Sequence, residues 1–176
     1  MVKRYYQGLL SLYFSGPMTM LAFIVFAIAF INNRKPEWNM IPALAAAAIV
    51  LAVVMFFYYK NKLGISKTLH HVENIQEYEK GGMLDRSFVL EDRILAGIGL
   101  KVSEHSTLNL KSATATEKGR KVILHIEGKD DSFDVQTIDR AEAERFAAYL
   151  RKNNPQIVLN GIEPKGNGTL KELSAE

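Results

Sequence analysis

Two histidines stand closest to residues that could do chemistry. His105 lies beside Ser103 and Ser106 in the segment SEHST, and a histidine base next to a serine hydroxyl is the pairing that nucleophilic catalysis requires. His125 lies between apolar residues in KVILHI, a segment that resembles a strand. Neither histidine belongs to a nucleophile-elbow motif. We therefore interpret both as structural, and we expect a protein that is not an enzyme.

Sites for metals and nucleotides have weak support in the sequence. The aspartates of residues 130–134 (DDSFD) are able to hold a hard cation, but aspartate is also a common turn residue. His70 and His71 are neighbours, so in a helix they point to different faces and do not bind one ion together. Residues 97–99 (GIG) lack the third glycine of a dinucleotide-binding loop, and the chain has no cysteine. We expect no metal and no cofactor.

Three basic residues of one expected hairpin, Lys118, Arg120 and Lys121, are the best candidates for contact with a lipid headgroup or a partner. Such contact requires a cluster of positive charge in one loop. Glu117 dilutes the charge at this position, and charges at a hairpin tip are often only solvated. Both interpretations stay open.

Antiparallel strands are expected to position these residues. From Met83 onward, short apolar runs alternate with turn residues, which is the pattern of a meander. Gly119 supplies the positive φ that a tight hairpin needs. We predict five or six strands, and residues 97–107 leave room for one more. The predicted strands are residues 87–90, 93–95, 97–102, 108–116, 121–126 and 133–137.

A helix is expected to follow the strands. Asp139 and Glu142 have the spacing of a capping box. Apolar residues then recur at i, i+3, i+4 and i+7 from Ala143 to Leu150, which gives one apolar stripe. Pro155 ends the pattern. The sequence therefore predicts a sheet covered by one helix, a domain of the α+β class.

The end of the sequence is expected to contribute little to this domain. Residues 156–160 (QIVLN) are compatible with a short strand that completes a domain over residues 83–160. Residues 161–176 are rich in glycine, lysine, glutamate and serine, a composition typical of a flexible tail.

Two apolar, uncharged runs precede the domain, at about residues 9–31 and 40–59. About 20 apolar residues suffice to span the hydrocarbon of a bilayer as a helix. Because the connection at residues 32–39 is short, we predict an antiparallel transmembrane hairpin over residues 1–59. The residues before Pro17 form either a short interfacial helix or part of one longer, tilted helix, and both interpretations stay open.

Aromatic and small residues have expected places in this hairpin. Trp38, Tyr58 and Tyr59 are expected as anchors at the membrane–water interface. Small residues let helices approach closely in lipid, so the second run is expected to pack against the first run or against a second copy of the chain. The alanines predicted to make this contact are Ala43, Ala47 and Ala48.

Positive charges flank the two runs unequally. Five Lys or Arg residues lie on the side of the termini and two lie in the connection. Because the more basic side usually stays in the cytoplasm, we predict that both termini are cytoplasmic. The five are Lys3, Arg4, Lys60, Lys62 and Lys67, and the two are Arg34 and Lys35.

The net charge of +3 belongs to the membrane part of the chain. The first 82 residues carry eight Lys or Arg and four Asp or Glu, whereas residues 83–160 carry twelve of each. Anionic lipid headgroups are the nearest partner of that excess, so we expect no nucleic acid to bind. Residues 60–82, with Ser66 as a possible N-cap, are predicted to form an amphipathic helical connector.

Several of these segments resemble bacterial PH-like domains, namely the KGRKVILHI arm, the FDVQTID step and the AEAERFAAYL helix. The layout resembles small bacterial membrane proteins in which a two-span hairpin precedes such a domain. The resemblance implies a partly open barrel of five to seven strands capped by a C-terminal helix, at a bacterial plasma membrane. It implies a binding module, and it does not bring phosphoinositide binding with it.

We therefore expect a membrane-anchored interaction or scaffold module. It would bind a membrane or cytoplasmic protein, or a second copy of itself, beside the lipid bilayer. The alternative is an accessory subunit of a transporter or other membrane complex, with the helices as the working part. An enzyme that acts on lipids or peptides at the membrane surface is a third interpretation.

Overall fold

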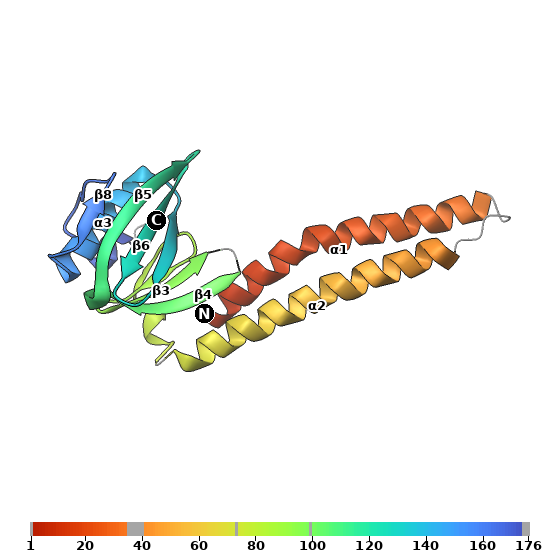
Figure 1. The fold of residues 1–176 in the computed structure, drawn as a ribbon, viewed down its shortest axis with the longest axis horizontal. Helices are drawn as coiled ribbons and strands as arrows, with labels where there is room; N and C mark the ends of the chain where they lie inside the picture. Colours follow the sequence, from red (N-terminus) through yellow and green to blue (C-terminus); the bar gives the residue numbers. More distant parts are fainter. Residues whose placement is uncertain (1, 35–40, 73, 99, 174–176) are drawn as a thin grey trace. The chain divides into compact units, whose positions relative to one another are not determined.

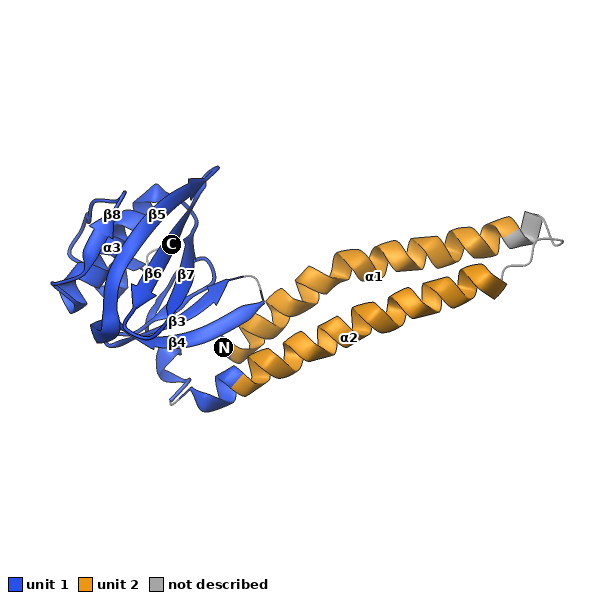
Figure 2. Cartoon of the chain, in the orientation of Figure 1, with its two compact units in different colours: residues 1–2, 68–176 blue, residues 3–67 orange. Residues whose placement is uncertain are grey.

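The chain forms two compact units. The computed structural model describes residues 2–34, 41–72, 74–98 and 100–173 (Figure 1). One unit runs from Lys3 to Lys67, and the other contains Val2 and the chain from Thr68 onward (Figure 2). The boundary lies inside a helix, so the sequence-based division at residues 59 and 82 does not coincide with it.

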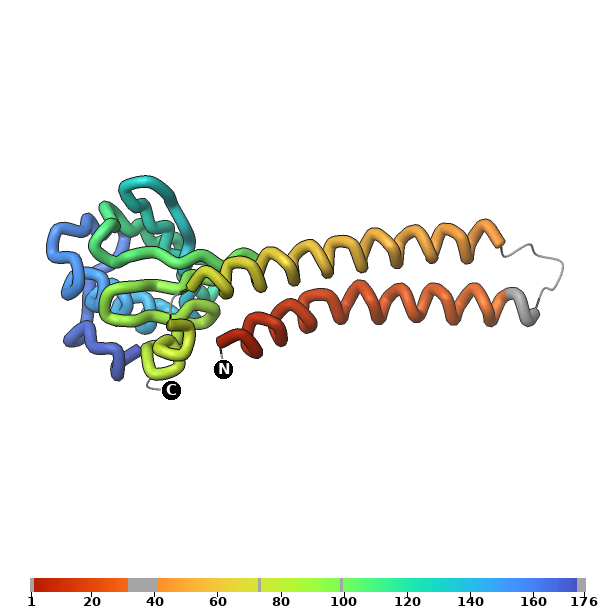
Figure 3. Tube along the Cα trace, turned by 90° about the horizontal axis from the view of Figure 1, so that it is seen from below, coloured from red at the N-terminus to blue at the C-terminus, as the bar shows by residue number. Residues whose placement is uncertain are grey.

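The first unit is made of two long helices, α1 (Val2–Arg34) and α2 (Ile41–His71), which run side by side (Figures 1 and 3). Both are long and apolar enough to cross a membrane, as predicted. Their large apolar side chains are mostly exposed, with Phe26 at 70%. A surface of this kind is stable in hydrocarbon and costly in water.

Helix α1 is continuous through Pro17. The structure therefore supports one long helix rather than a separate interfacial segment before Pro17. Ser15 does not cap a new helix, because its hydroxyl donates to the carbonyl of Leu12 at 2.7 Å within the same helix. Proline is tolerated inside apolar helices of this type, where local hydrogen bonds satisfy the freed backbone groups.

The predicted connector helix over residues 60–82 is wrong in its boundaries. Helix α2 continues through Gly64 and Ser66 to His71, so Ser66 is not an N-cap. A single glycine destabilises a helix by about 1 kcal/mol relative to alanine, and α2 is continuous through Gly64 despite this cost. The chain then turns and forms only a short 3₁₀ helix, η1 (Glu77–Glu79).

The second unit holds two four-stranded sheets, which confirms the α+β class. Sheet A has the order β1-β2-β3-β4, and sheet B has the order β7-β6-β5-β8. All pairs are antiparallel except β5 with β8. The strands are β1 (Gly82–Met83), β2 (Phe88–Val89), β3 (Arg93–Ile98), β4 (Lys101–Ser106), β5 (Leu110–Lys118), β6 (Lys121–Gly128), β7 (Ser132–Thr137) and β8 (Val158–Asn160).

One predicted strand is divided in the structure. Residues 97–102 were expected to form a single strand, but β3 ends at Ile98 and β4 begins at Lys101. The additional strand, β4, therefore lies within residues 97–107, where the sequence left room for one more strand. The β5–β6 hairpin is as predicted, with Gly119 at φ +66° in its turn. A short 3₁₀ helix, η2 (Thr107–Asn109), joins β4 to β5.

Helix α3 (Arg140–Asn153) covers the core between the sheets. The Asp139 carboxylate accepts the amide of Glu142 at 2.9 Å, and the Glu142 carboxylate accepts the amide of Ile138 at 2.6 Å. The predicted cap is thus present, with its return bond one residue earlier than in the usual capping box. The apolar stripe from Ala143 to Leu150 is buried.

The prediction of a flexible tail is wrong as far as residue 173. The tail packs onto the domain, with Leu173 buried and Leu170 partly buried against the core. A short helix, α4 (Leu170–Leu173), forms there. Gly168, at φ +62°, approaches the Ala148 carbonyl so closely that a Cβ would lie 2.6 Å from it. The polar composition of the tail concealed a few well-spaced apolar residues.

Candidate functional site

A tyrosine joins the segment after α2 to sheet A. Tyr78 is 1% exposed, and its hydroxyl donates to the Glu104 carboxylate of β4 at 2.8 Å. Glu104 lies opposite Leu95 in the β3–β4 register, so Tyr78 lies on the face of sheet A that carries the buried Leu95. Burial raises the pKa of Tyr78, and the bond to Glu104 raises it further, so the phenol remains a neutral donor.

Arg93 connects the carboxylates around this tyrosine. Its guanidinium lies 3.1 Å from Glu77, 3.3 Å from Asp92 and 3.7 Å from Glu104. Glu77 belongs to η1, whereas the other three residues belong to sheet A or its turn. The network of Arg93, Tyr78 and the three carboxylates, here called the connector network, therefore ties the segment after α2 to the sheet. Sequence reasoning placed Tyr78 within the predicted connector of residues 60–82 and missed Arg93 and Glu104.

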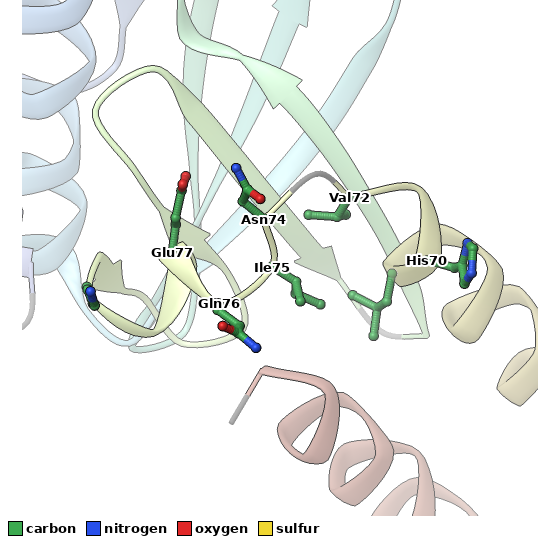
Figure 4. Close-up of a pocket in the computed structure, with 8 residues that line it drawn as sticks. His70, Val72, Asn74, Ile75, Gln76 and Glu77 are labelled. Atoms are coloured by element: carbon green, nitrogen blue, oxygen red, sulfur yellow. The ribbon is translucent and has the colours of Figure 1, made fainter.

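A pocket of about 690 Å³ lies between the end of α2 and η1 (Figure 4). Its apolar lining comes from Leu69, Val72 and Ile75, and Figure 4 shows Val72 and Ile75 on the loop after α2. The pocket can accept an apolar group that carries a polar end. The polar lining residues are His70, Asn74, Gln76, Glu77 and Lys80.

The three predicted basic residues lie together at the β5–β6 hairpin, but their charges are not equally available. Lys118 and Arg120 are exposed. Lys121 forms an ion pair with Asp85 of the β1–β2 turn at 2.8 Å. Burial opposes ionisation of Asp85, but hydrogen bonds from Lys121 and Gln136 outweigh it and lower the pKa of Asp85. Lys118 and Arg120 therefore remain as exposed positive charges at the hairpin, whereas the charge of Lys121 is paired.

His105 is the centre of a hydrogen-bonded chain. Its Nδ1 lies 3.0 Å from Asp131, and its Nε2 lies 2.7 Å from the Ser103 hydroxyl. The imidazole stacks on Phe133, with 3.7 Å between ring centroids. The order acid–imidazole–hydroxyl is that of a hydrolytic triad. Burial lowers the pKa of His105. These contacts join the β6–β7 turn to β4, and the structural interpretation of His105 stays a prediction.

His125 has a separate place. It lies opposite Asp134 in the β6–β7 register, with 2.7 Å between Nδ1 and the carboxylate. Among the residues that the structure describes, no group of three His, Asp or Glu could hold a metal ion, including those of the 130–134 turn.

The hairpin residues chosen from the sequence separate into two groups. Ala47 is buried and Ala43 half-buried, whereas Ala48 is exposed. Tyr58 is half-buried and contacts Phe14 of α1 edge to face at 5.5 Å. Ala43, Ala47 and Tyr58 thus serve the packing of α1 on α2, and Ala48 and Tyr59 lie outside it. Trp38 lies outside the described residues.

Comparisons with protein-family models, with characterised proteins and with solved structures gave no match to this chain. The molecule's own geometry is therefore the basis of the function proposed for it.

Proposed function

We propose that this protein is a membrane-anchored interaction module. Helices α1 and α2 hold the sheet domain at the cytoplasmic face of a bacterial plasma membrane, where the domain binds a partner protein. The observation that carries this proposal is the difference in exposure between the units. Phe26 and most other large apolar residues of the helices are exposed, whereas most of those of the sheet domain are buried, with Leu108 and Val158 among the exposed exceptions. A tethered domain meets its partners at high effective concentration, so weak contacts suffice.

The order of elements supports a PH-like domain. Strands β1 to β7 form two successive antiparallel meanders, and α3 follows them directly and covers the core. The resemblance implies a partly open barrel of five to seven strands with a C-terminal helix, and the number of these strands and the position of α3 support that proposal, although the strands lie in two open sheets. Strand β8 and helix α4 are additions to it. We propose that the two open sheets serve as the binding scaffold.

The charges near the helix ends support cytoplasmic termini. Five Lys or Arg residues lie on the side of the termini against Arg34 and Lys35 at the other end, and the more basic side is retained in the cytoplasm. A reporter that is active only in the cytoplasm, fused to the C-terminus of the full chain, should be active. If instead a reporter that is active only outside the cytoplasm is active in the same fusion, the assignment of the termini is reversed.

Crosslinking in intact membranes at native expression tests the interaction function. We expect a defined protein partner that is recovered with the full chain and lost when the sheet domain is exchanged for an unrelated soluble domain. Recovery of the uncrosslinked monomer alone would contradict the proposal. If the partner is still recovered after the exchange, the helices and not the sheet domain bind it.

The alternative of an accessory subunit is favoured by one observation, the exposed Ala48 on α2. Small residues on an outer helix face permit close approach of another helix in lipid. Ala48→Leu should then weaken assembly with the larger complex. Ala47→Leu is the matched control, because Ala47 is buried and its substitution should disturb the packing inside the unit instead.

A further inference from the structure

Strand β4 has one edge that no other described strand covers. It pairs with β3 alone. The amide of Thr107 donates to the carbonyl of Asp92 at 2.9 Å, which continues the same register by one pair. Hydrogen-bonded and non-hydrogen-bonded pairs alternate in an antiparallel ladder. The backbone amides of Val102, Glu104 and Ser106 therefore point away from β3, as do the carbonyls of Val102 and Glu104, whereas the Ser106 carbonyl begins η2.

The other sheet edges in the described chain are shorter than β4 or lie against other elements. Strand β7, also of six residues, pairs with β6 and lies against β3 and α3. Strand β8, of three residues, pairs with β5 and so covers its edge. Strand β1 has two residues, and α4 lies against it, with Leu173 Cβ only 2.9 Å from where a Cβ on Gly82 would be. Strand β4 has six residues and lies at the margin of sheet A (Figure 1). Long open edges are a template for another strand.

The chemistry of the edge defines its ligand. Outward amides and carbonyls recur at every second residue, about 6.8 Å apart, and an extended polypeptide backbone matches this repeat. The charges define its direction. The exposed Lys101 lies at the start of β4, whereas its end lies beside the exposed Asp131 and Glu91. Asp92, in the same turn as Glu91, already pairs with Arg93. An antiparallel strand would place its first residues near the carboxylates and its last near Lys101.

We propose that β4 binds an extended segment of a partner protein by antiparallel strand addition, with a basic residue at the start of the segment and an acidic residue at its end. This inference rests on the proposed interaction function and names the mode of binding. A second copy of the chain fits the edge less well. Pairing all three outward residues of β4 with those of another β4 would place Glu104 opposite Glu104, and like charges directly opposite are destabilising.

A proline substitution tests the edge without disturbing the ladder. Ser106 has φ −80°, which proline adopts readily, and its amide points away from β3. Ser106→Pro therefore removes one outward donor and keeps the β3–β4 bonds. Ser106→Ala is the matched control, because it removes the hydroxyl and keeps the amide. Protection of the Ser103 and His105 amides from hydrogen exchange verifies that the variants are folded.

The probe is a seven-residue peptide with lysine first, glutamate last and alternating threonine and valine between them. A second peptide has the two charged residues exchanged. Hydrogen exchange of the full chain in lipid nanodiscs is the measurement. We expect the first peptide to slow exchange at Val102, Glu104 and Ser106. Ser106→Pro should weaken its binding about five- to tenfold, the value of one hydrogen bond, and Ser106→Ala should not.

The possible results separate this inference from the proposed function. If neither peptide slows exchange at these amides at about 1 mM, strand addition at β4 is wrong, while a crosslinked partner still supports the interaction function. If the exchanged peptide binds more tightly, the proposed direction is wrong. If protection rises with protein concentration in the absence of peptide, the edge pairs with a second copy, and the assignment to a partner protein is overturned.

Discussion

Phe26 of α1 is 70% exposed, whereas Phe146 of α3 is fully buried. The two positions represent their regions, because the helical hairpin exposes most of its large apolar side chains and the sheet domain buries most of its own. Polar groups differ in the same way. Thr19 of α1 donates to the carbonyl four residues before it, whereas Thr137 of β7 donates to Val122 of β6. In this comparison the hairpin forms its hydrogen bond within one helix, and the stability of its apolar surface depends on the surrounding solvent. The sheet domain instead depends on contacts between residues that are distant in sequence.

The largest effect on stability is expected from substituting the buried phenylalanine, Phe146. Phe146→Ala should lower the free energy of unfolding of the sheet domain by about 3–5 kcal/mol, because it removes buried surface and leaves a cavity. Phe26→Ala, the control, should leave that free energy nearly unchanged. Pulse proteolysis in urea on the full chain in detergent measures both. Equal losses in the two variants would contradict the comparison.

At the exposed position, Phe26, a charged substitution should affect membrane insertion instead. Phe26→Arg is expected to make membrane insertion less favourable by about 3 kcal/mol, because arginine in the middle of a spanning helix is costly. The measurement is the fraction of chain that resists carbonate extraction from membranes. Phe26→Leu should insert normally. Unchanged insertion of the arginine variant would show that this face of α1 does not meet lipid.

The connector network provides a third test. Tyr78→Phe removes a hydroxyl that donates to the Glu104 carboxylate, and hydrogen bonds to charged groups contribute about 1.5–3 kcal/mol. We expect urea unfolding of the sheet domain to reflect a loss in this range. Tyr59→Phe is the control, since Tyr59 is exposed. A loss of equal size in both variants would show that the network does not stabilise the domain.

The cap of α3 should have a smaller effect. Asp139→Ala removes the acceptor of the Glu142 amide and should cost about 1 kcal/mol, the usual value of an N-cap. Asp139→Asn retains an acceptor and should recover most of the loss. Chemical denaturation of the three proteins decides the matter, and a variant as stable as the parent would indicate that the Glu142 side chain alone secures the helix start.

The effect of pH concerns His105 and is expected to be the smallest. Burial lowers its pKa from the ordinary value of 6.5, although Asp131 and Glu104 oppose this. The pKa of His105 is lower in the folded state than in the unfolded state. The neutral ring therefore contributes to the free energy of unfolding above about pH 6.5, and this contribution is lost as the pH falls. The free energy of unfolding should decline from about pH 7 to pH 5.5 and decline less in His105→Gln. A parallel decline in both proteins would remove His105 as its cause.

Features that depend on neighbouring residues were predictable from the sequence. The two apolar runs indicated α1 and α2, Gly119 indicated the β5–β6 turn, and Asp139 indicated the start of α3. Each of these features rests on local propensity or on a period in the sequence. The errors arose where packing overrides composition. The polar tail is held by Leu173.

The contacts of the candidate site were largely beyond sequence reasoning. Lys121 meets Asp85, 36 residues away, and Tyr78 meets Glu104, 26 residues away. No pattern in the sequence pairs these residues, because their proximity exists only after the sheets have formed. The open edge of β4 was hidden for the same reason, since the turn that divides β3 from β4 lies in a run that resembles a single strand.

The docking of β8 and α4 has a consequence for the order of events during synthesis. The hairpin is made first, and its helices can enter the membrane while the rest of the chain is still being translated. The strand that covers β5 and the helix that meets β1 come from the far end of the chain. At a typical rate of about 5–20 residues per second, the sheet domain waits several seconds for them. Under the proposed function, anchoring precedes completion of the fold, and the incomplete domain passes this interval beside the membrane with the edge of β5 unpaired.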